Sequence, residues 1–429
     1  MTAWRDTKSS GAEIQYTAPQ SVRDVIASLG RTEDVRFSPG NRRLAIAAFN
    51  RSRIAVFDID VTMSAAGKDV ALTRAVVISS THLKRPHGLD FIDDATLIVA
   101  NREGDAAIFK LPPGEISGRS CELSPIQVMR VGESHFLKSP GSVSVAREDQ
   151  RLKEILICNN SSNSVTRHLL DRGAGCAVTS SEVLLEKWLD VPDGVSVSRD
   201  RRWIAVSNHG THNVLLYEDA SPLSRSADPD GMLRCVHYPH GLRFSADDRH
   251  IFVADAGAPY IHLYAKDDQG WRGVRNPVAS FRVMDDSVFQ RGRHNPQEGG
   301  PKGLDIDGGM NVLVVTSEFQ PLAFFDLPAI LDGASLGPHL PGFDASAAKM
   351  RAEADPRIDP ELFEASRREQ QALQVRCELE ILEQARQART LAEAKAARAK
   401  ARLAAMKKSA PWRMTAPLRW IYSALRRIG

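Results

Sequence analysis

The chain has 429 residues, more than one ordinary compact domain needs, which suits a large repeat domain with an appendage. With 42% apolar and 25% charged residues the composition is that of a soluble globular protein, and the net charge of +3 excludes a strongly acidic or basic molecule. No apolar run of about 18 residues, no signal-peptide core and no CxxC pair are found, so we expect a cytoplasmic protein without a zinc knuckle.

Repeated segments dominate the chain after an N-terminal stretch, residues 1–19, that we expect to be disordered. Between residues 20 and 335 there are six similar segments, which begin at Glu33, Pro86, Pro140, Pro192, Pro239 and Pro301. In each segment a Pro/Gly turn leads into a short alternating strand, and a polar turn, an apolar run and a third strand follow. A weaker fourth strand is visible after several of them.

Four antiparallel strands repeated about every 50 residues predict an all-β fold, a six-bladed β-propeller. The sixth segment runs into Pro328 without a clear fourth strand. Because an open ring would leave an exposed strand edge, we expect residues 20–30 to supply the missing strand and close the ring.

The turn before each innermost strand places one residue per blade beside the central channel. Reading that position gives Glu33, His87, Pro140, Asp193, His240 and Lys302. The residue after the second strand of each blade forms a second set, which is Phe49 or Asn50, Asn101, Asn159, Asn208, Asp255 and Ser317, and we also expect Arg102 and Asn160 to line the channel. Such oxygen-rich, partly acidic rings suit a hard cation such as calcium. The alternative is that the asparagines and aspartates only cap turns and the histidines only bind water.

One blade carries a family resemblance. The segment Pro-His-Gly-Leu-Asp-Phe-Ile-Asp-Asp-Ala-Thr-Leu-Ile-Val-Ala-Asn at 86–101 resembles a blade of the arylesterase/paraoxonase lactonases, whose wider clan includes gluconolactonase and senescence-marker-type propellers. The resemblance covers residues 20–330. It implies that Glu33, in Thr-Glu-Asp, and Asp193, in Pro-Asp-Gly, are metal ligands, that Asn159 is a further candidate ligand, and that His87 matches the family's Pro-His-Gly.

The chain also departs from that family. Arg102 stands where the family has an active-site histidine, and His240-Gly241 replaces an Asp-Asn ligand pair. The remaining donors, which are Glu33, Asp193, Asn159 and His240, mix oxygen and nitrogen and suit either calcium or a transition metal. A metal here would polarise a lactone or ester carbonyl, with His87 as the acid/base.

The C-terminal region has a different composition. After a linker at 336–358, residues 359–408 lack glycine and are rich in Ala, Glu, Gln, Arg and Leu, which predicts a long basic helix with a patchy apolar stripe and a tendency to self-associate as a coiled coil. Residues 386–429 hold twelve lysines and arginines and one acid, a net of +11 that leaves −8 for the rest of the chain, since the total is +3.

The last segment, residues 409–429, interleaves aromatic and basic residues. Trp412, Arg413, Arg419 and Trp420 belong to an amphipathic basic segment that could bind an anionic membrane surface or a protein partner. Trp-Arg-Met-Thr-Ala-Pro-Leu-Arg resembles a C-terminal signature of bacterial glycosyltransferases and related surface-polysaccharide proteins. This resemblance implies a place at the cytoplasmic face of the plasma membrane. Nothing in the basic tract predicts sequence-specific binding of nucleic acid.

Two functions follow from these observations. The first is a propeller that binds a carbohydrate or protein and is tethered by its tail to a polysaccharide-assembly complex. The second is a metal-dependent lactonase or esterase that acts on a small lactone or ester at the channel mouth.

Overall fold

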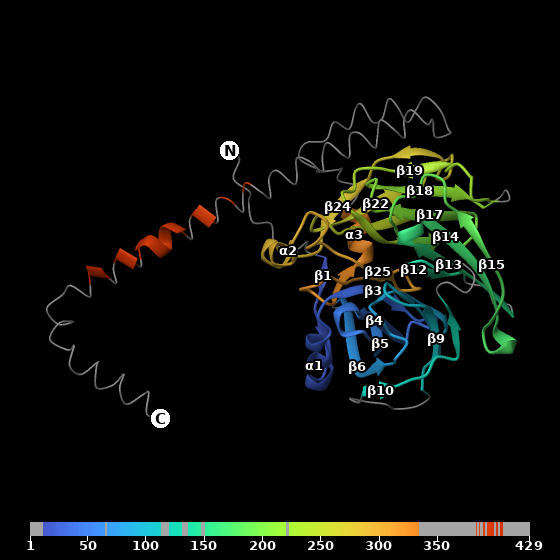
Figure 1. Cartoon of the computed structure of the whole chain (residues 1–429), viewed down its shortest axis with the longest axis horizontal. Helices are drawn as coiled ribbons and strands as arrows, with labels where there is room; N and C mark the ends of the chain where they lie inside the picture. Colours follow the sequence, from blue (N-terminus) through green and yellow to red (C-terminus); the bar gives the residue numbers. More distant parts are fainter. Residues whose placement is uncertain are drawn as a thin grey trace. The chain divides into compact units, whose positions relative to one another are not determined.

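A computed structural model describes residues 12–64, 67–112, 120–130, 136–146, 151–219 and 223–333, and scattered residues between 383 and 405. The described residues between 12 and 333 form six sheets. The innermost strands of these sheets contact one another in a closed cycle. The six-bladed propeller is therefore confirmed. In Figure 1 the orange strand β25 of the last blade lies beside the blue strand β3 of the first, where the ring closes.

The blades run from the innermost strand outward in chain order. Blade 1 consists of β3 (Thr32–Phe37), β4 (Arg43–Ala48), β5 (Arg53–Ser64) and β6 (Gly67–Ser79). Blade 2 consists of β7 (Pro86–Asp93), β8 (Thr96–Asn101), β9 (Ala106–Lys110) and β11 (Gln127–Met129). Blade 3 consists of β12 (Pro140–Val145), β13 (Leu152–Asn159), β14 (Ser164–Asp171) and β15 (Ala177–Leu185).

The other half of the ring is built in the same way. Blade 4 consists of β16 (Pro192–Val197), β17 (Trp203–Asn208), β18 (Asn213–Glu218) and β19 (Gly231–Leu233). Blade 5 consists of β20 (Pro239–Phe244), β21 (His250–Asp255), β22 (Tyr260–Ala265) and β24 (Ala279–Arg282). Blade 6 contains β25 (Leu304–Ile306), β26 (Val312–Val315) and β27 (Ala323–Asp326).

Shorter elements complete the ring. Two strands add in parallel to outer edges, β10 (Ser120–Glu122) on β6 and β23 (Gly273–Arg275) on β19. The helices are α1 (Gln20–Ser28), α2 (Asp286–Gly292) and α3 (Leu327–Gly333), and short 3-10 turns lie at Phe49–Arg51, Asn160–Ser162 and Arg172–Ala174.

Closure of the ring differs from the expectation. The fourth strand of blade 6 is β1 (Glu13–Ile14), which pairs antiparallel with β27, and β2 (Tyr16–Thr17) pairs with β6. The prediction that residues 20–30 form this strand is wrong, because residues 20–28 form the amphipathic helix α1, which buries Val22 and Ile26. Residues 12–19 are likewise ordered rather than part of a disordered N-terminus.

Apolar side chains pack between the blades. Among the described residues there are six clusters of buried apolar side chains, one between each pair of neighbouring blades. The alternation of apolar residues along each strand supplies both faces of a blade, so each blade depends on its two neighbours for its core.

The Pro-x-Gly turns bring the innermost strands close together. A Cβ atom on Gly194 would lie 2.2 Å from the carbonyl oxygen of His240 in the next blade, and one on Gly88 would lie 2.4 Å from that of Gly141. Only glycine permits this approach of backbone to backbone. The recurring glycine is thus explained by the narrow centre of the ring.

The tail falls almost wholly outside the described residues, including the linker and the segment that holds Trp412, Arg413, Arg419 and Trp420. The described residues between 383 and 405 are helical, with an ion pair from Arg389 to Glu393 one turn apart. The helix over 359–408 stays a prediction. No helix within the described parts of the chain is long and apolar enough to cross a membrane.

Candidate metal centre

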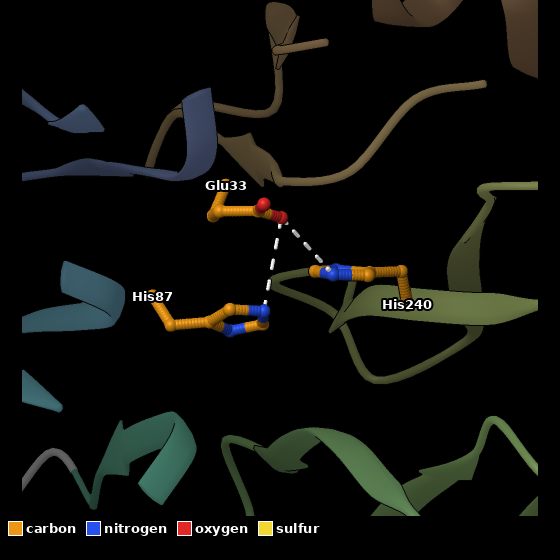
Figure 2. A group of neighbouring side chains, drawn as sticks. All are labelled: Glu33, His87 and His240. Carbon is orange, nitrogen blue, oxygen red and sulfur yellow. Dashed lines mark ion pairs between the residues drawn. The ribbon is translucent and has the colours of Figure 1, made fainter. Parts of the chain in front are cut away.

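Four side chains from four blades meet at one end of the channel, and we call Glu33, His87, Asp193 and His240 the donor cluster. Each follows the first residue of its innermost strand, where the pairing with the second strand shifts by a β-bulge. A bulge turns a side chain out of the regular alternation, and bulges are common beside functional sites. Figure 2 shows the rings of His87 and His240 directed at the carboxylate of Glu33.

The distances in the donor cluster match a metal site. Glu33 Oε2 lies 3.3 Å from His240 Nε2 and 3.7 Å from His87 Nε2. Asp193 lies 3.3 Å from His240 Nε2 through Oδ2 and 3.9 Å from His87 Nε2 through Oδ1. Four ligands held ~2.1 Å from one tetrahedral ion would lie ~3.4 Å from one another. One donor atom each from Glu33, His87 and His240 lies within 4.8 Å of the others, so the group could hold a metal ion.

The donor cluster is buried and largely in the protonation states that metal ligands need. Burial favours the neutral carboxyl, but Lys302 and His87 hold the pKa of Glu33 well below its usual range. Burial is likewise outweighed by Arg102 and His240, which hold the pKa of Asp193 well below its usual range. Burial and Arg102 lower the pKa of His87 well below its usual value. Two carboxylates and a neutral imidazole are therefore present at neutral pH.

Around the donor cluster the fixed charges leave an excess of negative charge. Arg31 pairs with Glu33 and Glu298, and the Nζ atom of Lys302 lies 2.7 Å from Glu298. Arg102 pairs with Asp193, and Glu318 interacts with Arg31. Counting these residues gives four carboxylates, Glu33, Asp193, Glu298 and Glu318, against three cations, Arg31, Arg102 and Lys302. The buried Oε2 atom of Glu33 makes no hydrogen bond among the described residues. Both observations favour a bound cation.

A second layer covers the donor cluster, and its members occupy the position just after each second strand. The Nη2 atom of Arg102 donates to His87 Nε2 over 2.6 Å and to Asp193 Oδ1 over 2.7 Å. Asn160 donates to the same Asp193 oxygen over 2.9 Å, and the ring of Phe49 packs edge-on against His87. Arg102 and Asn160, which the sequence analysis assigned to the channel lining, thus contact Asp193, while Lys302 pairs with Glu298.

Blade 3 makes room for this layer. The position that corresponds to His87 in blade 3 is Gly141 and not Pro140, because Pro140 pairs with Asn159 as Pro86 pairs with Asn101. A Cβ atom on Gly141 would lie 2.4 Å from the Asn160 side-chain oxygen and 3.3 Å from Arg102. Blade 3 therefore supplies no donor and leaves space for two side chains that reach Asp193.

The sequence analysis missed His209, the blade 4 member of the second layer. Its Nδ1 atom lies 3.8 Å from Asp193 Oδ2 and, being buried, has no hydrogen-bond partner among the described residues. Burial lowers the pKa of His209 to about 4, so the ring is neutral at pH 7. The signal was present, because His209 follows Asn208 as Arg102 follows Asn101 and Asn160 follows Asn159.

The asparagines and aspartate at the ends of the second strands are turn caps, and the prediction of Asn159 as a ligand is not supported. Backbone N–H groups two residues before each proline donate to these side chains: Lys84 to Asn101, Lys138 to Asn159, Asp190 to Asn208 and His237 to Asp255. The Asn159 amide also donates to Ile157 and Thr166. With their hydrogen-bonding groups used in this way, Asn101, Asn159, Asn208 and Asp255 hold the loops that carry the donor cluster.

Asp255 also begins a chain that resembles a hydrolytic triad. His262 bonds to Asp255 through Nε2 over 3.1 Å and to Ser280 through Nδ1 over 2.7 Å. Blade 3 repeats this chain without an acid, since His168 bonds to Thr166 and Ser181. Both chains run outward across a blade, so we interpret them as links between strands.

Comparison with known proteins adds little to this picture. No family model matches the chain, and no curated protein matches it by sequence. Among solved structures it is similar to a luciferin-regenerating enzyme (13% identity, TM-score 0.44, covering 70% of this chain and 92% of that one) and to the PQQ domain of pyranose dehydrogenase from Coprinopsis cinerea (12%, 0.47, 70% and 93%). A functionally unknown protein from Desulfotomaculum acetoxidans is also similar (10%, 0.44, 69% and 83%). The assignment of the fold rests on the six sheets themselves.

Proposed function

We propose that this protein is a metal-dependent hydrolase that acts on a small lactone or ester at the donor cluster. The observation that carries the proposal is the convergence of Glu33, His87 and His240 from three blades onto one buried point, with Asp193 of a fourth blade 3.3 Å from His240. Two imidazoles in this set favour zinc, manganese or iron over calcium, which takes oxygen ligands almost exclusively. The resemblance of residues 86–101 to the lactonase clan supports the choice of substrate.

The bound metal would polarise the carbonyl of the substrate and lower the pKa of a metal-bound water. His87 would then be a metal ligand through its Nε2 atom. It could not also serve as the acid/base expected from the sequence, so another residue must take that role. We assign that role to His209, which is neutral, 8% exposed and beside Asp193. Arg102, released from His87 and Asp193 by the metal, would have its guanidinium free beside the donor cluster to orient the carbonyl oxygen.

Hydrolysis of δ-gluconolactone and of phenyl acetate by the full-length protein, with and without added zinc or manganese, tests this function. We expect metal-dependent turnover that Glu33→Gln abolishes. His209→Asn should lower kcat about a hundredfold while leaving metal binding intact. His294→Ala, which removes an exposed imidazole paired with Glu318 near the channel, is the matched control. Turnover that does not depend on metal, or that survives in Glu33→Gln, would contradict the proposal.

A second proposed role concerns the tail and rests on its net charge of +11 between residues 386 and 429. We propose that the propeller is held at the anionic inner face of the plasma membrane by Trp412, Arg413, Arg419 and Trp420, in a bacterial surface-polysaccharide setting. The full-length protein should co-sediment with phosphatidylglycerol vesicles. Removal of residues 386–429 should abolish most of this binding. Equal sedimentation of both proteins would rule out the anchor and leave a protein partner or self-association.

A further inference from the structure

The end of the channel opposite the donor cluster opens into a cavity of about 720 Å³. It is lined by the last residues of the innermost strands and by the turns that follow them. Each blade contributes one side chain to the cavity from the residue three positions after its channel position at the other end (33, 87, 141, 193, 240 or 302). These residues are Arg36, Asp90, Ser144, Ser196, Arg243 and Asp305. The volume is in the range of sites for small organic ligands.

Unpartnered polar groups lie at the floor of this cavity. Ser144 and Ser196 are only 6% and 4% exposed, and both line the cavity. Arg36 and Arg243 are buried, and their Nε and Nη2 atoms, respectively, lack partners there. A buried N–H group without a partner is costly, so the presence of two at a cavity favours a ligand that supplies the missing oxygen atoms.

The charges of the lining favour an anion. Six cations line the cavity, Arg36, Lys153, Arg172, Arg199, Arg201 and Arg243, against five aspartates, Asp90, Asp93, Asp94, Asp305 and Asp307. Each of the five aspartates accepts a hydrogen bond from a backbone N–H group of a turn or strand. Four of the cations are ion-paired, Arg36 with Asp34, Arg172 with Asp93, Arg201 with Glu154 and Arg243 with Asp305, whereas Arg199 forms no ion pair within the described residues and is free to bind an anion.

Two of these arginines stand on one turn at the edge of the cavity. Arg199 and Arg201 lie between β16 and β17, and both are exposed. Arg199 forms no ion pair within the described residues and donates only to the carbonyl of Ala246, over 3.4 Å. Arg201 pairs with Glu154 over 3.1 Å. A guanidinium without a carboxylate partner can bind a carboxylate or phosphate through two parallel hydrogen bonds.

We propose that this cavity, named here the exit cavity, binds an acidic sugar. The anionic group lies against Arg199 and Arg201, and the sugar hydroxyls bond to Ser144 and Ser196. A monosaccharide or disaccharide fills the volume, and its hydroxyls supply the oxygens that the floor lacks. The exit cavity lies at the opposite ends of the same strands from the donor cluster, so this binding does not depend on the proposed hydrolase.

Isothermal titration of the full-length protein with D-glucuronate, D-glucose and inorganic phosphate tests the proposal. We expect D-glucuronate to bind more tightly than either of the others, since it alone offers both the anion and the hydroxyls. Arg199→Gln with Arg201→Gln should weaken this binding about tenfold or more. Ser144→Ala with Ser196→Ala should weaken it about fivefold, and should remove the preference over inorganic phosphate.

Two controls separate this site from the rest of the molecule. Arg225→Gln removes an exposed arginine that pairs with Glu186, away from the cavity, and should leave binding unchanged. Glu33→Gln should also leave it unchanged, since Glu33 belongs to the donor cluster. If D-glucuronate fails to bind, or binds all variants equally, the proposal is overturned. Equal affinity for D-glucuronate and inorganic phosphate would overturn the assignment of a sugar.

Discussion

Arg102 competes with a metal ion for two members of the donor cluster. Its guanidinium occupies His87 Nε2 and Asp193 Oδ1, the same atoms that a metal would need. Arginine can only donate, so His87 Nε2 must be the acceptor in this contact. Metal binding therefore requires Arg102 to break its hydrogen bonds to His87 and Asp193. Each of these bonds contributes about 1.5 kcal/mol or more.

We predict that Arg102→Met raises the affinity for zinc or manganese at least about tenfold, because the competing donor is gone. Competition titration against a fluorescent chelator measures this change. Arg85→Met, which removes an exposed arginine paired with Glu103 in the same blade, is the matched control and should have no effect. An unchanged or weaker affinity in Arg102→Met would show that the arginine and the metal do not compete.

The Pro-x-Gly pattern marks His87, Asp193 and His240, and Thr-Glu-Asp at the equivalent place of the first segment marks Glu33. It could not separate ligands from turn caps, because asparagine serves in both roles and the decision depends on which backbone N–H groups lie nearby. Asn159 is the example: its amide is fully engaged by Lys138, Ile157 and Thr166. His209 was missed although it follows Asn208 as Arg102 follows Asn101, because the residue just after the strand was not compared in every blade.

At the scale of elements, ring closure depends on a strand of two residues. β1 covers the edge of β27 through Glu13 and Ile14, and Tyr16 packs edge-on against Phe324 at 5.5 Å. So short a strand carries no periodicity of its own, and it forms only because β27 offers an unpaired edge from the other end of the domain. The sequence therefore predicted the need for closure, but assigned it to the amphipathic segment that forms α1.

Removing residues 1–18 should lower the thermal midpoint and promote self-association, because the edge of β27 and its apolar neighbours become exposed. We expect a loss of ~2 kcal/mol or more from the contacts of Ile14 and Tyr16. Differential scanning calorimetry and light scattering measure the two effects. A protein that lacks only residues 1–11 is the control. If both truncated proteins match the full-length chain, β1 does not close the ring.

For the molecule as a whole, buried histidines set the response to acid. Burial lowers the pKa of His168 and of His209 to about 4. Burial together with Arg102 lowers the pKa of His87 well below its usual value. Between pH 4.5 and 6.5 the unfolded chain therefore binds three protons at these sites that the folded chain does not. Asp34 acts in the opposite direction, because burial raises its pKa to about 6 and the folded chain binds its proton. The net difference is about two protons.

Stability should consequently rise as the pH increases from 4.5 to 6.5. Urea unfolding at a series of pH values measures the slope, which should approach two protons at its steepest. His168→Gln, far from the donor cluster in blade 3, should reduce the slope by about one proton. A free energy of unfolding that falls over this interval, or a slope unaffected by His168→Gln, would contradict the assignment of neutral buried histidines.

The metal content of the full-length protein tests the central claim most directly. The protein is loaded with zinc or manganese, desalted and analysed by mass spectrometry, beside Glu33→Gln with His240→Ala and beside the control His294→Ala. We predict one ion per chain in the wild type and the control, and none in the double variant. Substoichiometric metal in the wild type, or equal metal in all three proteins, would contradict a metal centre formed by Glu33, His87, Asp193 and His240.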